Sequence, residues 1–111
     1  VSGGFCRMDN SQLRNTTFCA VNVNHHGITE LVNLSISDSA EGVKSIDLAE
    51  VTINKLQLKN VDTGVLAFRK NDEMGGGTIT IKDMESENVA KRNVHDMHST
   101  IILDRQELPS Q

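Results

Sequence analysis

The segment RKNDEMGGG at residues 69–77 carries the densest group of side chains that could bind a charged ligand. Two basic residues, Arg69 and Lys70, are followed by Asp72 and Glu73, and three glycines end the segment. Guanidinium, ammonium and carboxylate groups form charge-assisted hydrogen bonds, so this segment could hold a charged polysaccharide or a protein partner. A plain surface loop is the alternative interpretation, because glycines also relieve backbone strain where a loop rejoins an ordered element.

Two histidines, His95 and His98, form a weaker candidate site. On a helical turn their imidazoles would share one face and offer two nitrogen ligands to a transition metal. A tetrahedral site needs more ligands, and the spacing supplies no third one. The sequence therefore predicts no metal and no cofactor, and a polar loop explains both residues adequately.

The two thiols, Cys6 and Cys19, do not have the spacing of metal ligands. They could form a disulfide, but two cysteines in an unknown compartment are more often buried and reduced. We therefore expect free thiols and leave the compartment open. Because Val1 is not an initiator methionine, we also expect the chain to be a fragment or a processed form of a longer protein.

The composition excludes several classes of function. The net charge is −4 and the acidic groups are scattered, so no basic surface is predicted for nucleic acid. No apolar run approaches the ~20 residues that a membrane helix needs, so no membrane span is expected. Valine, isoleucine and leucine dominate the apolar residues and only three aromatics occur, a composition that favours strands over helices.

An internal repeat indicates the elements that would position these groups. The segment TELVNLSISDSAEGV at 29–43 matches VTINKLQLKNVDTGV at 51–65, with every matching position 22 residues apart. The segment ITIKDMESENV at 79–89 matches 51–61 again, now at a longer offset, so six residues must be inserted between Phe68 and Ile79. The matched pairs of the first two segments include Leu31 with Ile53, Leu34 with Leu56, Ile36 with Leu58, Asp38 with Asn60, Gly42 with Gly64 and Val43 with Val65.

Within each repeat, apolar residues alternate with polar ones and short polar corners intervene, which is typical of strands with one buried face. The sequence therefore predicts an all-β fold, a short right-handed parallel β-helix of about four coils with a 22-residue repeat. Like residues should stack on like residues, including a polar column of Asp38, Asn60 and Asn88 at one corner. Antiparallel hairpins in a small sandwich are the alternative, but they give no reason for the likeness between repeats.

We expect one domain over residues 1–111. It comprises an irregular first coil over 1–27, regular coils over 28–89 with the inserted loop at 69–77, and a final strand and tail over 99–111. In the first coil, Leu13 restores an inward-facing residue only if the register shifts by one residue. Each end of a strand stack exposes an edge, for which the tail with Pro109 could act as a cap at one end.

Residues 42–108 resemble the C-terminal coils of right-handed β-helix repeat segments found in large bacterial surface or secreted proteins, some of them linked to CotH-type domains. The resemblance is carried by IDLAEVTINKLQLKNVDTGVLAFRKNDEMGGGTITIKDM and by STIILDRQEL, somewhat over half of the chain. It implies a β-helix at a cell surface or outside the cell, and it implies no catalytic residue.

A non-catalytic structural or interaction module of a larger bacterial protein is the function that we expect. It would bind a protein or associate with itself through an open end, or bind a charged polysaccharide through the loop. A fragment of a polysaccharide-cleaving, lyase-like β-helix enzyme is the first alternative, with Arg69, Lys70 and Asp72 near the substrate. An assembling fibre or coat element is the second. Asp38, Asp62 and Asp72 do not follow the spacing of an oxygen-rich calcium loop.

Overall fold

The computed structural model describes residues 3–71, 73–104 and 106–107, the last two for their backbone only. It is an all-β fold, as the sequence predicts, and its described residues contain no helix, so none that could cross a membrane. The strands are β1 Phe5–Arg14, β2 Cys19–Val23, β3 Ile28–Ile46, β4 Glu50–Phe68, β5 Thr78–His95, β6 Thr100–Leu103 and β7 Gln106–Glu107.

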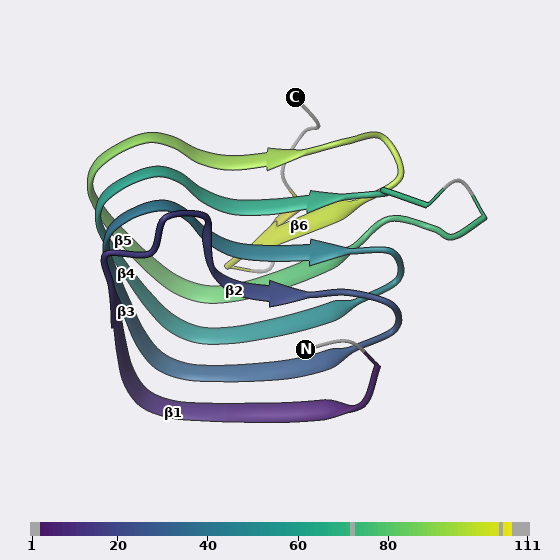
Figure 1. The fold of residues 1–111 in the computed structure, drawn as a ribbon, viewed down its shortest axis with the longest axis horizontal. Helices are drawn as coiled ribbons and strands as arrows, with labels where there is room; N and C mark the ends of the chain where they lie inside the picture. Colours follow the sequence, from purple (N-terminus) through teal and green to yellow (C-terminus); the bar gives the residue numbers. More distant parts are fainter. Residues whose placement is uncertain (1–2, 72, 105, 108–111) are drawn as a thin grey trace.

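All of these strands belong to one sheet, in which parallel pairing dominates. Strands β1, β3, β4, β5 and β6 are neighbours in that order, β2 pairs with β3, and only β7 is antiparallel to its neighbour β6. Figure 1 shows that the long strands bend and lie one above another, with the chain returning to the same side after each. The antiparallel hairpins considered as an alternative do not occur between β1 and β6.

The pairing register follows the sequence repeat. Leu34 of β3 pairs with Leu56 of β4, which stands one repeat later in the chain. Leu56 in turn pairs with Met84 of β5, and their longer separation in the chain arises because the insertion precedes β5. The predicted stacking of residues that are one repeat apart is therefore confirmed for these strands.

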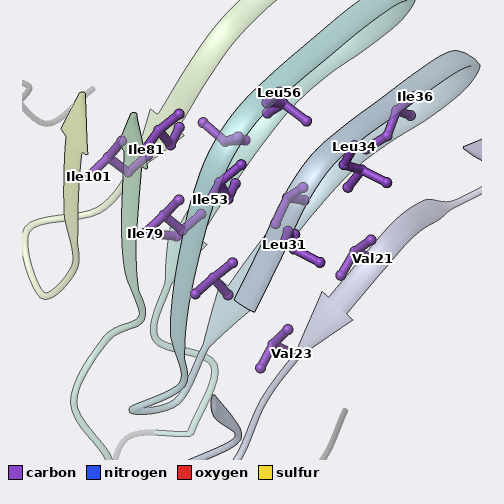
Figure 2. Packing of buried hydrophobic residues seen from close by; sticks show 14 of the residues in the cluster. Val21, Val23, Leu31, Leu34, Ile36, Ile53, Leu56, Ile79, Ile81 and Ile101 are labelled. Atoms are coloured by element: carbon purple, nitrogen blue, oxygen red, sulfur yellow. The ribbon is translucent and has the colours of Figure 1, made fainter. Parts of the chain in front are cut away.

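Alternate side chains of the stacked strands fill one core. Leu31, Ile53 and Ile81 succeed one another on β3, β4 and β5, and each is at most 1% exposed. Figure 2 shows that labelled side chains from these strands lie on the same inner side of the ribbon and contact those of the next strand. Each such side chain contributes ~1.5–3 kcal/mol through its removal from water, so these columns hold the strands together.

The register of β1 on β3 is shifted by one residue relative to the sequence repeat. Leu13 of β1 pairs with Ile36, one position further along the chain than the repeat requires, whereas Val21 of β2 pairs with Val43 in the usual register. One extra residue is therefore accommodated in the connection between Arg14 and Cys19. The shift points Leu13 inward, as the sequence analysis anticipated, although the side chain stays partly exposed at the edge of the core.

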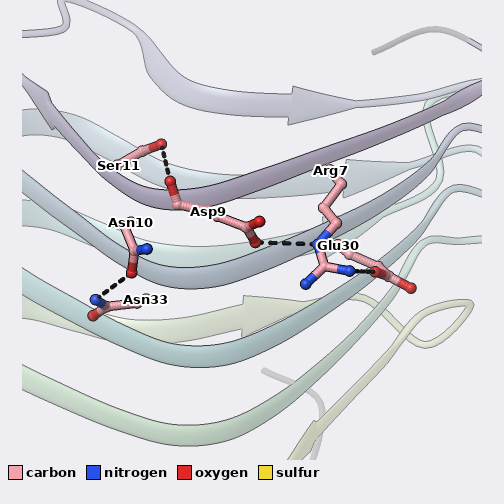
Figure 3. Close-up of polar contacts among 6 residues, drawn as sticks. All are labelled: Arg7, Asp9, Asn10, Ser11, Glu30 and Asn33. Carbon is pink, nitrogen blue, oxygen red and sulfur yellow. Dashed lines mark hydrogen bonds and ion pairs between the residues drawn. The ribbon is translucent and has the colours of Figure 1, made fainter.

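Polar side chains form ladders at the corners where the strands bend. Asn60 donates its Nδ2 hydrogen to Asp38 Oδ1 at 3.0 Å, and Asn88 donates to Asn60 Oδ1 at 2.7 Å. A second corner repeats the pattern, where Asn33 donates to Asn10 at 2.8 Å (Figure 3). All five residues have φ between 49° and 55°, the left-handed conformation that asparagine and aspartate tolerate best. The predicted polar column of Asp38, Asn60 and Asn88 at one corner is therefore confirmed.

Replacing Asn60 tests how much one corner ladder contributes. Asn60→Ala removes two inter-strand hydrogen bonds and places a Cβ-bearing residue without a polar side chain in the left-handed conformation. We expect it to lower the free energy of unfolding by about 2 kcal/mol. Asn60→Gly keeps the conformation and loses only the hydrogen bonds, so its effect should be smaller. Urea unfolding measures both, and wild-type stability of both variants would contradict the role of the ladder.

Candidate functional site

The segment 69–77 connects β4 to β5 at a corner where the other connections are short turns. Each of those turns is closed by a backbone hydrogen bond, from Gly27 to Asn24, from Ala49 to Ile46 and from Ser99 to Asp96. Figure 1 shows that the connection from β4 to β5 extends well beyond the neighbouring turns. This loop is the main departure from an otherwise regular stack, and loops on rigid scaffolds often carry function.

Two aspartates on the neighbouring turns fasten the loop. Asp47 Oδ1 accepts hydrogen bonds from the backbone amides of Lys70 and Asn71, both at 2.8 Å. Asp96 Oδ2 accepts one from the amide of Arg69, also at 2.8 Å. On the loop side these bonds use backbone amides, and the ammonium of Lys70 adds an electrostatic attraction to Asp47. The first residues of the loop are thus positioned from both sides.

The far end of the loop is fastened by the backbone and by one hydroxyl. The amide of Gly76 donates to the carbonyl of His98 at 3.1 Å, and Leu48 donates to the carbonyl of Gly76 at 3.1 Å. The amide of Gly77 donates to Ser99 Oγ at 3.1 Å. A Cβ on Gly77 would overlap the carbonyl of Ser45, so only glycine fits this close approach.

The electrostatics of both aspartates match their role as anchors. Burial raises the pKa of Asp47, but hydrogen bonds from the amides of Asn71 and Lys70 outweigh it, so the pKa lies below its ordinary value. Burial likewise opposes ionisation of Asp96, and the amide of Arg69 and the hydroxyl of Ser99 hold its pKa below the usual value. Both carboxylates are therefore charged at neutral pH and bind the chain itself.

Acid should weaken this anchorage. A carboxylate whose pKa is lowered on folding contributes its full stabilisation above the unfolded pKa, and the contribution is lost as the pH falls through the folded value. We expect Asp47→Asn to lower the melting temperature at neutral pH and to flatten its dependence on pH between about pH 5 and pH 2. The exposed Asp62→Asn is the matched control, and an equally flattened profile for it would contradict the assignment.

The structure places the predicted loop residues as follows. Lys70 and Glu73 are exposed, Arg69 is half-buried, and Asp72 lies outside the described residues. The loop therefore presents charges of both signs to solvent. Sequence reasoning missed its anchors, although Asp47 stands one repeat before Arg69 in the chain and could have been found by that alignment.

The two histidines of the weaker candidate site do not share a face. His95 ends β5 rather than lying on a helical turn, and it is only 2% exposed, whereas His98 is exposed on the following turn. Within the described part of the chain, no three His, Cys, Asp or Glu side chains lie together as a metal site would require. The geometry that made these histidines a candidate is therefore not present.

Both cysteines are free thiols in the structure. Cys19 donates its Sγ hydrogen to the carbonyl of Val21 at 3.0 Å, and burial raises the pKa of this thiol to about 11. A thiol with a raised pKa is a poor nucleophile at neutral pH, so Cys19 acts as a packing residue.

A polar groove that sequence reasoning did not single out crosses the outer surface of β1, β3, β4 and β5. It has a volume of about 610 Å³, and none of the loop residues 69–77 lines it. Stacked polar residues form its floor, where Ser35 donates to Gln57 at 2.9 Å and Gln57 donates to Glu85 at 3.3 Å. Its charged residues are Arg14, Asp38, Lys59, Glu85 and Glu87.

Both ends of the strand stack have an unpaired edge within the described residues. At one end, β1 and β2 pair only with β3, and the inward-facing Met8 and Leu13 remain partly exposed. At the other end, residues 82–95 of β5 pair only with β4, because β6 covers β5 only over 78–81. Unpaired edges with apolar side chains beside them are sites at which another strand can pair.

The comparisons with known proteins found no match. No family model matches the chain, and no curated protein or solved structure does so either. The interpretation of the site therefore depends on its geometry.

Proposed function

We propose that this chain is a short right-handed parallel β-helix of about four coils, serving as a non-catalytic structural and interaction module of a larger protein. It displays the loop at 69–77 on one side and offers open strand edges at its ends. A bacterial cell-surface or extracellular setting is suggested by the sequence resemblance alone.

The observation that carries this proposal is the pair of open ends on a regular parallel stack. The register of β3 on β4 and of β4 on β5 holds over nearly their whole lengths, so the stack is well formed in its middle. Among the described residues, the strands that lack a neighbour on one side lie at the two ends: β1 and β2 at one end, and β7 and the second half of β5 at the other. A protein whose unpaired surface is concentrated at its ends is suited to pair with further strands there.

The charged groups of the loop support binding rather than catalysis. A general acid or base needs a titrating group that is free to exchange a proton with a substrate. Among the described side chains, the two carboxylates whose pKa departs from its ordinary value, Asp47 and Asp96, are instead occupied by backbone amides. Arg69 and Lys70 are then held in place to bind a charged polysaccharide or a protein partner.

An assay on acidic polysaccharides tests this proposal against the lyase-like alternative. The full chain is incubated with a panel of them, with and without calcium, and unsaturated chain ends are measured by absorbance. We expect no turnover, with any binding weakened by Arg69→Ala and Lys70→Ala but unchanged in the exposed control Lys55→Ala. Turnover that is lost in Arg69→Ala would overturn the non-catalytic function.

A further inference from the structure

The chain contains two N-x-Ser/Thr motifs, the sequence signal for attaching a sugar to an asparagine side chain. They are Asn15-Thr16-Thr17 and Asn33-Leu34-Ser35. A transferase needs the motif on an accessible surface segment, so the fold decides which of the two can be used. We propose that Asn15 is an acceptor site for an N-linked sugar and that the fold excludes Asn33.

Asn15 lies in the irregular connection between β1 and β2. Figure 1 shows that this connection leaves the smooth path that the neighbouring strands follow through the same bend. Asn15 and Thr17, the two residues that define the motif, are both exposed. The amide of Asn15 donates to the carbonyl of Ser37 at 3.1 Å, which fastens the backbone to β3. Among the described residues, β1 and β2 pair only with β3, so an enzyme can approach the connection from the opposite side.

The carboxamide of Asn15 is free to react. The ladder at this corner runs from Asn88 to Asn60 and from Asn60 to Asp38, whose carboxylate has no hydrogen to donate further. Within the part of the chain that the structure describes, the side chain of Asn15 makes no hydrogen bond. Its Nδ2 nitrogen is therefore available as a nucleophile, and a sugar on it would displace no contact.

Asn33 is also exposed, but its motif is locked in the sheet. Its Nδ2 donates to Asn10 Oδ1 at 2.8 Å (Figure 3), and the hydroxyl of Ser35 donates to Gln57 Oε1 at 2.9 Å. The middle residue, Leu34, is 1% exposed on β3, which lies between β1 and β4. Modification of Asn33 would break the corner ladder and require β3 to separate from its neighbours, which core strands do rarely.

The transfer is a substitution at the anomeric carbon of the sugar. The donor carries the sugar as a diphosphate ester, on either a nucleoside or a polyprenyl lipid. Asn15 Nδ2 forms a bond to the anomeric carbon, and the bond from that carbon to the diphosphate oxygen breaks. The diphosphate leaves with the electron pair, and a base of the transferase accepts the proton that Nδ2 loses. This chain supplies only the nucleophile and the hydroxyl of Thr17, by which the transferase recognises the motif.

Incubation of the folded full chain with two kinds of transferase tests the acceptor site. One arm uses a soluble enzyme that recognises N-x-Ser/Thr with UDP-glucose as the donor, and the other a membrane enzyme with a polyprenyl-diphosphate oligosaccharide. Intact mass and peptide mapping should show a single sugar, on Asn15, in at least one arm, and the productive arm identifies the carrier. Transfer to Asn33 should be more than about tenfold slower, because it requires β3 to open.

Variants of both motifs identify the site. Asn15→Gln and Thr17→Ala should each abolish the modification, whereas Thr17→Ser should retain it because the motif accepts either hydroxyl. Ser35→Ala destroys the second motif, leaves Asn33 in place, and should be modified like the wild type. Circular dichroism establishes that each variant is folded.

The outcomes separate the acceptor site from the proposed function. A folded wild-type chain that receives no sugar in either arm would overturn the proposal, as would transfer to Asn33 as fast as to Asn15. Modification that persists in Asn15→Gln would also overturn it. The non-catalytic function would stand in all these cases, because it fails only by turnover in the polysaccharide assay.

Discussion

Replacing Ile53 with aspartate should abolish the cooperative unfolding transition. Ile53 is 1% exposed in the middle of the core column on β4, with Leu31 on one side and Ile81 on the other. The substitution removes ~1.5–3 kcal/mol of apolar burial and buries a charge with no partner, at an effective cost of several kcal/mol. Native domains have only ~5–15 kcal/mol to lose. Circular dichroism during thermal unfolding measures the result.

The neighbouring residue provides the control for that experiment. Thr52 precedes Ile53 on the same strand, but its side chain is exposed on the outer face. Thr52→Asp should unfold with a transition close to that of the wild type, within about 0.5 kcal/mol. A native-like transition in Ile53→Asp would contradict the assignment of the aliphatic columns as the core.

Gly64→Ala should also destabilise the strand stack. A Cβ at this position would lie 2.7 Å from the carbonyl oxygen of Arg92 on the next strand and 2.7 Å from a methyl group of Leu58. Because the first of these is backbone, the strands must shift to relieve the overlap. We expect a loss of about 2 kcal/mol, which is typical of an overpacked core, measured by urea unfolding.

An exposed substitution on the same strand isolates the packing effect. Asp62→Ala changes a solvent-facing residue two positions earlier and should alter the free energy of unfolding by no more than about 0.5 kcal/mol. If Gly64→Ala were as stable as the wild type, this result would contradict the close packing of β4 against β5 at Gly64. A Cβ on Gly42, the matching glycine of the preceding repeat, would come still closer to the backbone carbonyl of Gly64.

The repeat predicts the regular part of the fold because the same physical constraint acts on every strand. A stacked position that must be apolar on β3 must also be apolar on β4, so Leu34 and Leu56 reveal their pairing in the sequence. The corner asparagines reveal themselves in the same way, since each needs the left-handed conformation. The loop at 69–77 could be located from the insertion that lengthens the repeat, but its shape could not.

The parts that the sequence did not predict depend on contacts outside the repeat. Asp47 and Asp96 anchor the loop by accepting hydrogen bonds from its backbone amides. Because the donors are backbone groups, the residue types in the loop do not indicate these bonds. His95 is polar but buried, because its position at the end of β5 continues a core column through Ala67. The outer groove is lined by residues of β1, β3, β4 and β5 together, so no single segment of the sequence indicates it.

Methyl NOEs between Leu34 and Leu56 test the central claim most directly. Parallel stacking with one repeat per strand predicts strong NOEs between the methyl groups of these two leucines, and between those of Leu56 and Met84. An antiparallel hairpin that turned between Ile46 and Glu50 would instead place Leu34 opposite Asp62. NOEs from Leu34 to Asp62 in place of those to Leu56 would contradict the account.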